Sequence, residues 1–221
     1  MDRQGPAEGS SSPSAKLRVV AAGRSGTIGE RFKITLSDGS SFLLPADALL
    51  QPGLPVGELQ PDGELAPEEV GRLKELAAGY SLRSRALRLL GASAQTAAGL
   101  RRKLSARGAA PPAVEAVLDS LAREGLLDDR AFARGWVQSR LERHPEGAGL
   151  LVAGLLRRGV GRELAREVVG ELLDPQAERR SAERLLEKLG RRSGMSRERL
   201  EATLGKRGFS RALIREFLED R

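Results

Sequence analysis

The chain has no cysteine and only one histidine, His144, among its 221 residues. Without thiols it can form neither a disulfide framework nor a thiolate metal site. A single imidazole argues against an all-protein zinc site and against catalysis that depends on histidine. These absences favour a binding function over an enzymatic one and predict that no cofactor is held.

Aromatic residues make up only 3% of the chain, and leucine and alanine dominate the 40% that is apolar. This composition favours packed helices over a large sandwich or barrel. No apolar run approaches the ~18 residues that suggest a membrane span. The N-terminus also lacks the charged-then-apolar order of a signal peptide. We therefore expect a cytoplasmic protein with no membrane partner.

The formal charge of +7 is unevenly distributed along the chain. Residues 1–80 hold 8 basic and 11 acidic side chains, whereas residues 81–221 hold 29 and 19. A basic region behind a slightly acidic head indicates a polyanionic partner. The alternative is that the arginines coat solvated helix faces.

The first 80 residues predict a disordered tail, a small β-rich region and a connecting helix. Apolar residues alternate between Leu17 and Leu44 in two or three short strands, which need cover from other elements. The Asp38–Gly39 pair predicts a type I′ hairpin turn. Residues 51–64 are rich in proline and glycine and predict a linker. The expected divisions are a tail at 1–15, a β-rich domain at 16–60 and a connecting helix at 64–80.

Three similar hexamers divide the rest of the chain at regular intervals. Each has an apolar residue, two further residues, a base, a glycine and a small or apolar residue: Leu104–Ala109, Leu155–Val160 and Leu204–Phe209. Their glycines lie 51 and 49 residues apart, a period typical of helical repeats. We expect three helices in each of three repeats, at 81–127, 128–173 and 174–221. The predicted fold is mainly α: three tandem three-helix repeats in an elongated array behind a small β domain, α+β overall.

Helix capping explains much of this hexamer. Its glycine stands where a helix end needs a left-handed residue, and the preceding base complements the helix dipole. The arginines are explained less well, because one cation per helix end is enough. Asp128 or Asp129 is expected to cap the next helix. Trp136 lies one turn after Phe132 on an apolar stripe, so we expect it in the core, not stacked on a base.

Clustered cations in the repeats are the candidate binding residues. Arginine suits phosphate and carboxylate alike, because its planar fork makes two hydrogen bonds. The clusters can therefore contact a nucleic-acid backbone or an acidic protein surface, and the sequence leaves both open. The candidates are Arg101, Arg102, Lys103, Arg107, Arg130, Arg134, Arg140, Arg143, Arg157, Arg158, Arg162, Lys206 and Arg207.

Three segments lie in order along the chain: Gly125–Ala133, Leu155–Val160 and Lys206–Ser210. Together they resemble the RecX regulatory proteins, which bind the bacterial RecA recombinase, and the first is similar to that family's junction of the first two helix triplets. Their order and spacing agree with the family over residues 80–221. The stretch Ala94–Leu100 departs from the serine–glutamate capping pattern that many members carry, and predicts a weaker cap there.

The resemblance implies a non-enzymatic modulator of homologous recombination and the SOS response. Such a protein binds the filament of RecA on single-stranded DNA and inhibits its ATPase, strand-exchange and coprotease activities. Contact with double-stranded DNA is left open, and a monomer is expected. The alternative is an independent helical-repeat DNA-binding protein or transcription regulator.

Overall fold

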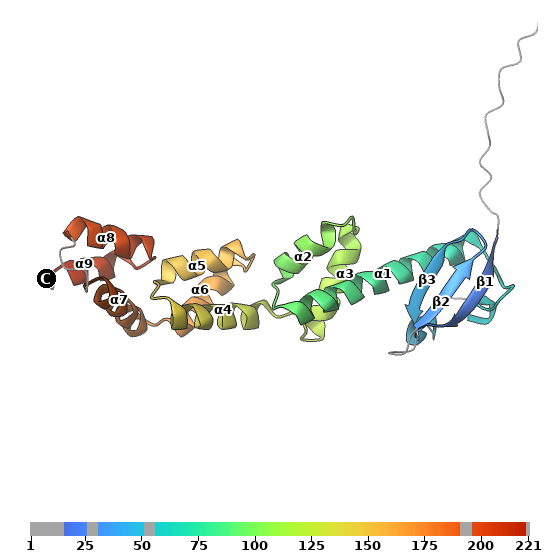
Figure 1. Cartoon of the computed structure of the whole chain (residues 1–221), viewed down its shortest axis with the longest axis horizontal. Helices are drawn as coiled ribbons and strands as arrows, with labels where there is room; N and C mark the ends of the chain where they lie inside the picture. Colours follow the sequence, from blue (N-terminus) through green and yellow to red (C-terminus); the bar gives the residue numbers. More distant parts are fainter. Residues whose placement is uncertain (1–15, 26–30, 51–55, 191–195, 220–221) are drawn as a thin grey trace, which may run out of the picture. The chain divides into compact units, whose positions relative to one another are not determined.

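The computed structural model describes residues 16–25, 31–50, 56–190 and 196–219 (Figure 1). The expected tail at 1–15 and part of the expected linker lie outside these residues. The chain divides into two compact units, Met1–Arg85 and Ala86–Arg221. The mainly helical fold with an N-terminal sheet is confirmed. The elongated arrangement of the repeats stays a prediction.

The first unit contains an antiparallel sheet with strand order β3-β2-β1-β4. Three strands fall where the sequence predicts them: β1 (Leu17–Arg24), β2 (Arg31–Leu36) and β3 (Ser41–Pro45). The fourth, β4 (Glu64–Leu65), pairs with β1 at the end of the segment expected to be a linker. Two residues are too few to show an alternating pattern, so no sequence pattern indicates this strand.

The hairpin between β2 and β3 differs from the predicted type I′ turn. Gly39 has φ +83°, but Asp38 does not have a positive φ. The amide of Gly39 donates to the carbonyl of Leu36 at 2.9 Å, and Asp38 Oδ1 accepts from the Ser40 amide at 2.9 Å. This pattern fits a type I turn followed by a left-handed glycine. The Asp38–Gly39 pair lies in the hairpin turn as predicted, but only Gly39 adopts the left-handed conformation.

A helix covers the buried face of the sheet, as strands this short require. Ile34, Leu36 and Leu44 are buried with Val70 and Leu73 of α1 (Pro67–Ala92). The 3₁₀ helices η1 (Ala46–Leu50) and η2 (Val56–Glu58) lie in the connection from β3 to β4.

One continuous helix, α1, replaces the two helices predicted on either side of residue 81. It begins with acidic side chains in its first turn, and Glu69 Oε2 accepts from the Ala66 amide at 2.7 Å. No proline interrupts it, and a Cβ added at Gly79 would meet no atom within 4 Å. A glycine and a serine lower helix propensity without ending the helix.

The remaining helices follow the repeat pattern (Figure 1). After α1 come α2 (Ala97–Ser105), α3 (Pro111–Arg123), α4 (Asp129–Arg143), α5 (Ala148–Arg157), α6 (Arg162–Leu172), α7 (Pro175–Gly190), α8 (Arg197–Lys206) and α9 (Arg211–Glu219). Apolar residues of these helices are buried: Val137, Leu151 and Leu155 share the core of α4–α6. Leu204 and Ile214 share that of α7–α9.

The repeated glycines end the second helix of each repeat, as predicted. Gly108, Gly159 and Gly208 have φ of +80°, +87° and +81°. Beyond the second and third glycines, the amides of Val160 and Phe209 donate back to the last turn of the helix, at 3.2 and 3.3 Å. Both side chains are buried, which completes a left-handed helix cap with its apolar contact.

Candidate cationic surface of the helical repeats

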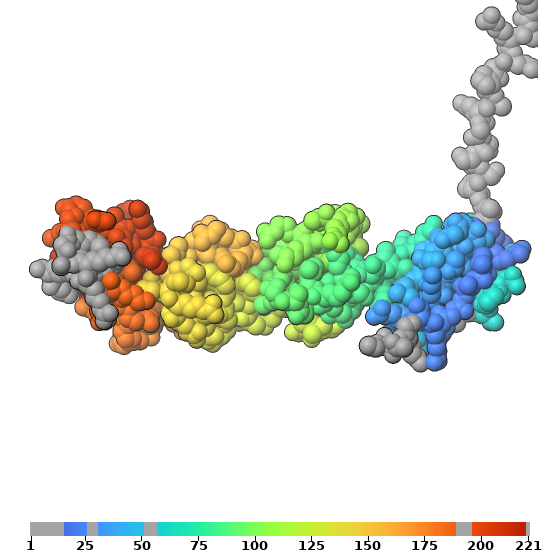
Figure 2. All heavy atoms as spheres, in the orientation of Figure 1, coloured from blue at the N-terminus to red at the C-terminus, as the bar shows by residue number. Residues whose placement is uncertain are grey.

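The predicted cations fall at the ends and on the faces of five helices. Arg101, Arg102 and Lys103 are on α2; Arg130, Arg134, Arg140 and Arg143 on α4; Arg157 on α5; Arg162 on α6; and Lys206 on α8. Arg107 follows α2, and Arg158 and Arg207 are C-cap residues. Atoms of these repeats run from green to red in Figure 2. These candidates form two groups: side chains with a partner inside the chain, and side chains without one among the described residues.

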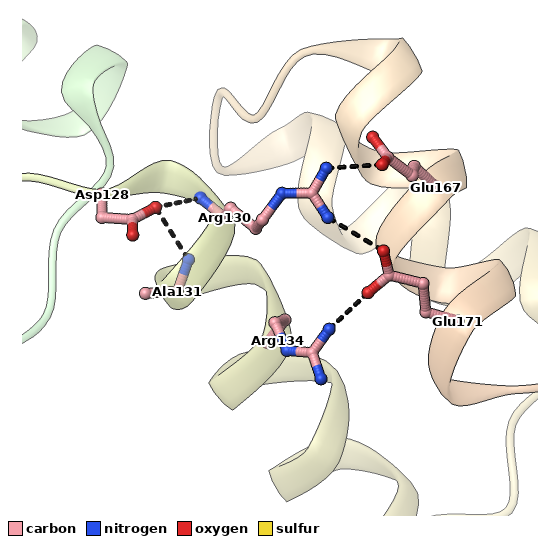
Figure 3. A network of polar contacts seen from close by, with 6 residues as sticks. All are labelled: Asp128, Arg130, Ala131, Arg134, Glu167 and Glu171. Atoms are coloured by element: carbon pink, nitrogen blue, oxygen red, sulfur yellow. Dashed lines mark hydrogen bonds and ion pairs between the residues drawn. The ribbon is translucent and has the colours of Figure 1, made fainter.

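Arg130 and Arg134 bind acidic residues of their own repeat (Figure 3). The Arg130 guanidinium donates to Glu167 at 2.5 Å and to Glu171 at 2.9 Å. Arg134 donates to the other carboxylate oxygen of Glu171. Both hydrogen bonds raise the pKa of Arg130, and the bond to Glu167 contributes more than the bond to Glu171. The network joins α4 to α6, so both arginines have a structural explanation that the sequence did not reveal.

Arg101 is held in a similar way within the first repeat. Its guanidinium donates two hydrogen bonds of 2.6 Å to the carboxylate of Glu115 on α3. These bonds lower the pKa of Glu115 and raise that of Arg101. The neighbouring Lys103 donates to the side-chain oxygen of Gln95 at 2.8 Å. Two of the four candidates near α2 therefore have intramolecular partners.

Arg140 pairs with a buried acid. Its Nε donates to Glu146 Oε2 at 3.0 Å, and its terminal nitrogen donates to Oε1. Glu146 is 2% exposed. A buried carboxylate needs a cation and hydrogen bonds to offset the loss of its hydration. Arg140 supplies both, so its position is fixed by the fold.

Arg158 lies over the ring of Trp136, 4.5 Å from the ring centroid. It also donates to the carbonyl of Gly154 at 2.9 Å. Trp136 itself is half-buried and packs against the core of the second repeat. The predicted core position of this residue is confirmed, and a cation covers a face of the ring that a base could have used.

Seven candidates have no such engagement among the described residues. No hydrogen bond or ion pair within residues 16–25, 31–50, 56–190 and 196–219 involves their side chains. We call them the unpaired cations: Arg102, Arg107, Arg143, Arg157, Arg162, Lys206 and Arg207. Six are exposed and Arg207 is half-buried. Each repeat contributes at least two, so the available positive charge is spread over all three.

Comparison with known proteins decides the family. The models described as "RecX, first three-helix domain" and "RecX, second three-helix domain" match residues 83–121 and 128–169. Regulatory protein RecX of Mycobacterium leprae is 40% identical over 136 residues, which cover 59% of this chain and 79% of the relative. The chain belongs to the RecX family. The predicted family is therefore confirmed.

Two further comparisons agree with this membership. Regulatory protein RecX of Treponema pallidum (strain Nichols) is 38% identical over 139 residues, covering 63% of this chain and 84% of the relative. A crystal structure of a regulatory protein RecX superposes with a TM-score of 0.74 and 22% identity, over 93% of this chain and all of the other. The second likeness concerns the fold alone. RecX proteins are regulatory and not enzymes, and this chain is classed with them.

The aspartates at the start of α4 have structural roles in this RecX-family chain. Asp128 Oδ1 accepts from the amides of Arg130 and Ala131 at 2.8 and 3.0 Å, which makes Asp128 the predicted N-cap. Asp129 accepts from the Ala97 amide. Across the described part of the chain, no group of three or more His, Cys, Asp or Glu could hold a metal ion. Within the same residues, no helix combines the length and apolar character needed to cross a membrane.

The sequence-based selection missed part of the third RecX repeat. Arg197, Arg199 and Arg211 are exposed in the first turns of α8 and α9, outside the predicted set. In this repeat the prediction named only the two bases of the hexamer, Lys206 and Arg207, which lie at a helix C-terminus. Arg179 was also missed: it joins α7 to Glu216 of α9 and lies 5.2 Å from the Phe217 ring centroid.

Proposed function

We propose that this chain regulates RecA by binding its filament on single-stranded DNA, mainly as an inhibitor of ATP hydrolysis, strand exchange and coprotease activity. It acts as a cytoplasmic monomer in homologous recombination, DNA repair and the SOS response. Family membership carries the proposal, since relatives with 38–40% identity are named regulatory protein RecX. Eleven of the thirteen candidate cations lie in the two stretches that the family models match.

The unpaired cations support contact with a polyanionic filament. An exposed guanidinium without an intramolecular acid can bind phosphate or carboxylate without first breaking an ion pair. Arg102 and Arg107 supply this charge in the first repeat, Arg157 and Arg162 in the second, and Lys206 in the third. We assign the main contacts with DNA backbone or recombinase acids to the unpaired cations.

The six engaged candidates take a secondary part in the proposed surface. They are Arg101, Lys103, Arg130, Arg134, Arg140 and Arg158. A partner phosphate must compete with their intramolecular acceptors, so each contributes less to binding than an unpaired arginine. Their substitution also disturbs contacts within the repeats, which makes them poor tests of binding alone.

Binding to the filament and to bare DNA, measured side by side, tests the proposal. Fluorescence anisotropy of labelled single-stranded DNA, with and without RecA, gives both affinities at low and moderate salt. We expect tighter binding to the RecA-coated strand. Tighter binding to bare single- or double-stranded DNA, with a salt slope equivalent to six or more phosphates, would instead support an independent DNA-binding protein.

A further inference from the structure

The start of one repeat's second helix contacts the end of the next repeat's second helix. An α-helix leaves four amides at its start and four carbonyls at its end without intrahelical partners. At the start of α2, the buried Thr96 hydroxyl donates to the carbonyl of Arg158, the C-cap of α5, at 2.7 Å. The first turn of α2 and the glycine cap of α5 are therefore in direct contact.

A corresponding contact, made by backbone amides instead of a side-chain hydroxyl, occurs one repeat later. At the start of α5, the Gly147 amide donates to the carbonyl of Arg207 at 2.9 Å. The Gly149 amide donates to the carbonyl of Gly208 at 3.0 Å. In both places, the positive end of one helix dipole meets the negative end of the next repeat's second helix. We call these two contacts the first and second joints.

A carboxylate from the following repeat completes each joint. The Ala97 amide donates to Asp129 Oδ1 at 2.7 Å, and the Ala148 amide donates to Glu178 Oε1 at 2.9 Å. Both amides belong to the first residue of a second helix, and both acids lie near the start of the next repeat's first helix. At both joints, therefore, a carboxylate on the next repeat's first helix accepts a hydrogen bond from the first amide of a second helix.

Close packing explains why the cap residue at each joint is glycine. A Cβ on Gly159 would lie 2.4 Å from the Cβ of Ala98, and one on Gly208 would lie 2.2 Å from the backbone nitrogen of Leu150. Gly108 has the same left-handed conformation, yet an added Cβ would meet no described atom within 4 Å. The three glycines share a capping role, and the last two also keep the repeats in contact.

Among the residues that the structure describes, no third joint follows this pattern. The second helices at the joints begin with small residues, Ala97–Ala98 and Ala148–Gly149, whereas α8 begins with Arg197–Glu198. In the first repeat, residues 76–92 contain no acid that could take the place of Asp129. The last repeat therefore lacks the small residues of a joint, and the first repeat lacks its acid. Both absences oppose a joint between two copies of the chain.

We propose that the two joints hold the unpaired cations of successive repeats at the spacing that filament inhibition requires. This inference rests on the proposed function. The joint residues act as positioning residues. The carbonyls of Arg158 and Arg207 accept hydrogen bonds from the preceding repeat, and these two residues directly follow the unpaired cations Arg157 and Lys206. Sites held at a fixed spacing bind a long partner together, because the first contact raises the effective concentration of the next.

Three glycine-to-alanine variants separate the joint from the cap. Gly108→Ala, Gly159→Ala and Gly208→Ala all place alanine at a positive φ, so they share the cost of an unfavourable cap. Only the last two also push repeats apart. Hydrogen exchange at Ala97 reports on the first joint, and exchange at Gly147 and Gly149 on the second, because those amides bond across repeats. RecA ATP hydrolysis on single-stranded DNA gives the concentration for half-inhibition.

The expected result is a difference among variants of similar helix content. Gly159→Ala and Gly208→Ala speed exchange at their own joint and raise the half-inhibitory concentration about tenfold or more, which corresponds to about 1.4 kcal/mol. Gly108→Ala stays within about twofold of the original chain. Inhibition that survives an opened joint overturns the proposal. Unchanged exchange in Gly159→Ala or Gly208→Ala overturns the joint itself.

Asp129→Asn provides a second test that leaves every glycine in place. It weakens the bond to the Ala97 amide, whereas Asp128→Asn, the control, affects only the cap of α4. We expect faster Ala97 exchange and weaker inhibition from Asp129→Asn alone, and equal inhibition by the two variants counts against the proposal. Failure of the original chain to inhibit RecA refutes the proposed function, while the exchange data still decide whether the joints exist.

Discussion

Thr96 makes two hydrogen bonds with one hydroxyl. It accepts from the Gly99 amide at 3.0 Å and donates to the carbonyl of Arg158 at 2.7 Å. We expect Thr96→Val to lower the free energy of unfolding by about 1–2 kcal/mol, because a cap and a buried bond are lost together. Urea denaturation measures the change, and Thr96→Ser should retain most of the stability. A valine variant as stable as the original chain would refute this role.

Gly154 provides a second test of packing at a single residue. A Cβ there would lie 2.3 Å from the Trp136 ring, whereas one on Gly170, in α6 of the same repeat, meets nothing within 4 Å. We expect Gly154→Ala to destabilise the chain by about 1–3 kcal/mol through overpacking. Gly170→Ala should stabilise it by up to about 1 kcal/mol through helix propensity. Thermal unfolding of the two variants checks the opposite signs, and equal shifts would contradict them.

At the scale of the elements, ion pairs between helices differ in value according to burial. Arg140 faces a carboxylate that is 2% exposed, whereas Arg134 faces Glu171, which is 36% exposed. We expect Arg140→Gln to cost about 2 kcal/mol, less than the ~3–5 kcal/mol of fully buried pairs because Arg140 itself is partly exposed. Arg134→Gln should cost less than about 1 kcal/mol. Urea denaturation compares them, and a larger cost for Arg134→Gln would contradict this ranking.

The contact between α2 and α3 makes stability depend on pH. Hydrogen bonds from Arg101 lower the pKa of Glu115 below its ordinary value of 4.5. A carboxyl with a lowered pKa in the folded chain stabilises it above that ordinary value, and the contribution is lost as the pH falls through the folded pKa. Arg101→Gln should therefore narrow the difference in unfolding free energy between neutral and acidic pH. Arg102→Gln, which alters an unpaired neighbour, should not, and equal narrowing by both would refute the assignment.

Sequence patterns predicted most helices and strands because periodicity directly reflects burial. The stripe through Leu100 and Leu104 and the alternation through Ile34 and Leu36 both lie in cores. The patterns failed where local signals are weak. The predicted division at residue 81 falls inside one helix that runs on through Gly79 and Ser81, because helix ends are set by capping and packing. Strand β4 is too short to carry any period.

At the scale of the whole chain, the candidate surface was predicted less completely than the fold. The sequence showed where cations gather, but a salt-bridge partner 37 residues away leaves no local trace. Arg130 and Glu167 illustrate this, since helix packing alone brings them together. The repeated glycine was identified as a helix cap, which is correct for all three copies. The second role of Gly159 and Gly208, in contact with the preceding repeat, depends on tertiary structure and could not be predicted from the sequence.

The central claim is that this RecX-family chain restrains RecA through its unpaired cations. ATP hydrolysis by RecA on single-stranded DNA, followed as the chain is titrated, tests it most directly. We predict that the chain suppresses turnover and that a variant with Arg107, Arg157 and Arg162 changed to Gln requires about tenfold more protein or more. A charge-matched control with Arg18, Arg31 and Lys33 of β1 and β2 changed to Gln should stay within about twofold. Turnover unchanged by the original chain, or equally suppressed by the triple variant, would contradict the account.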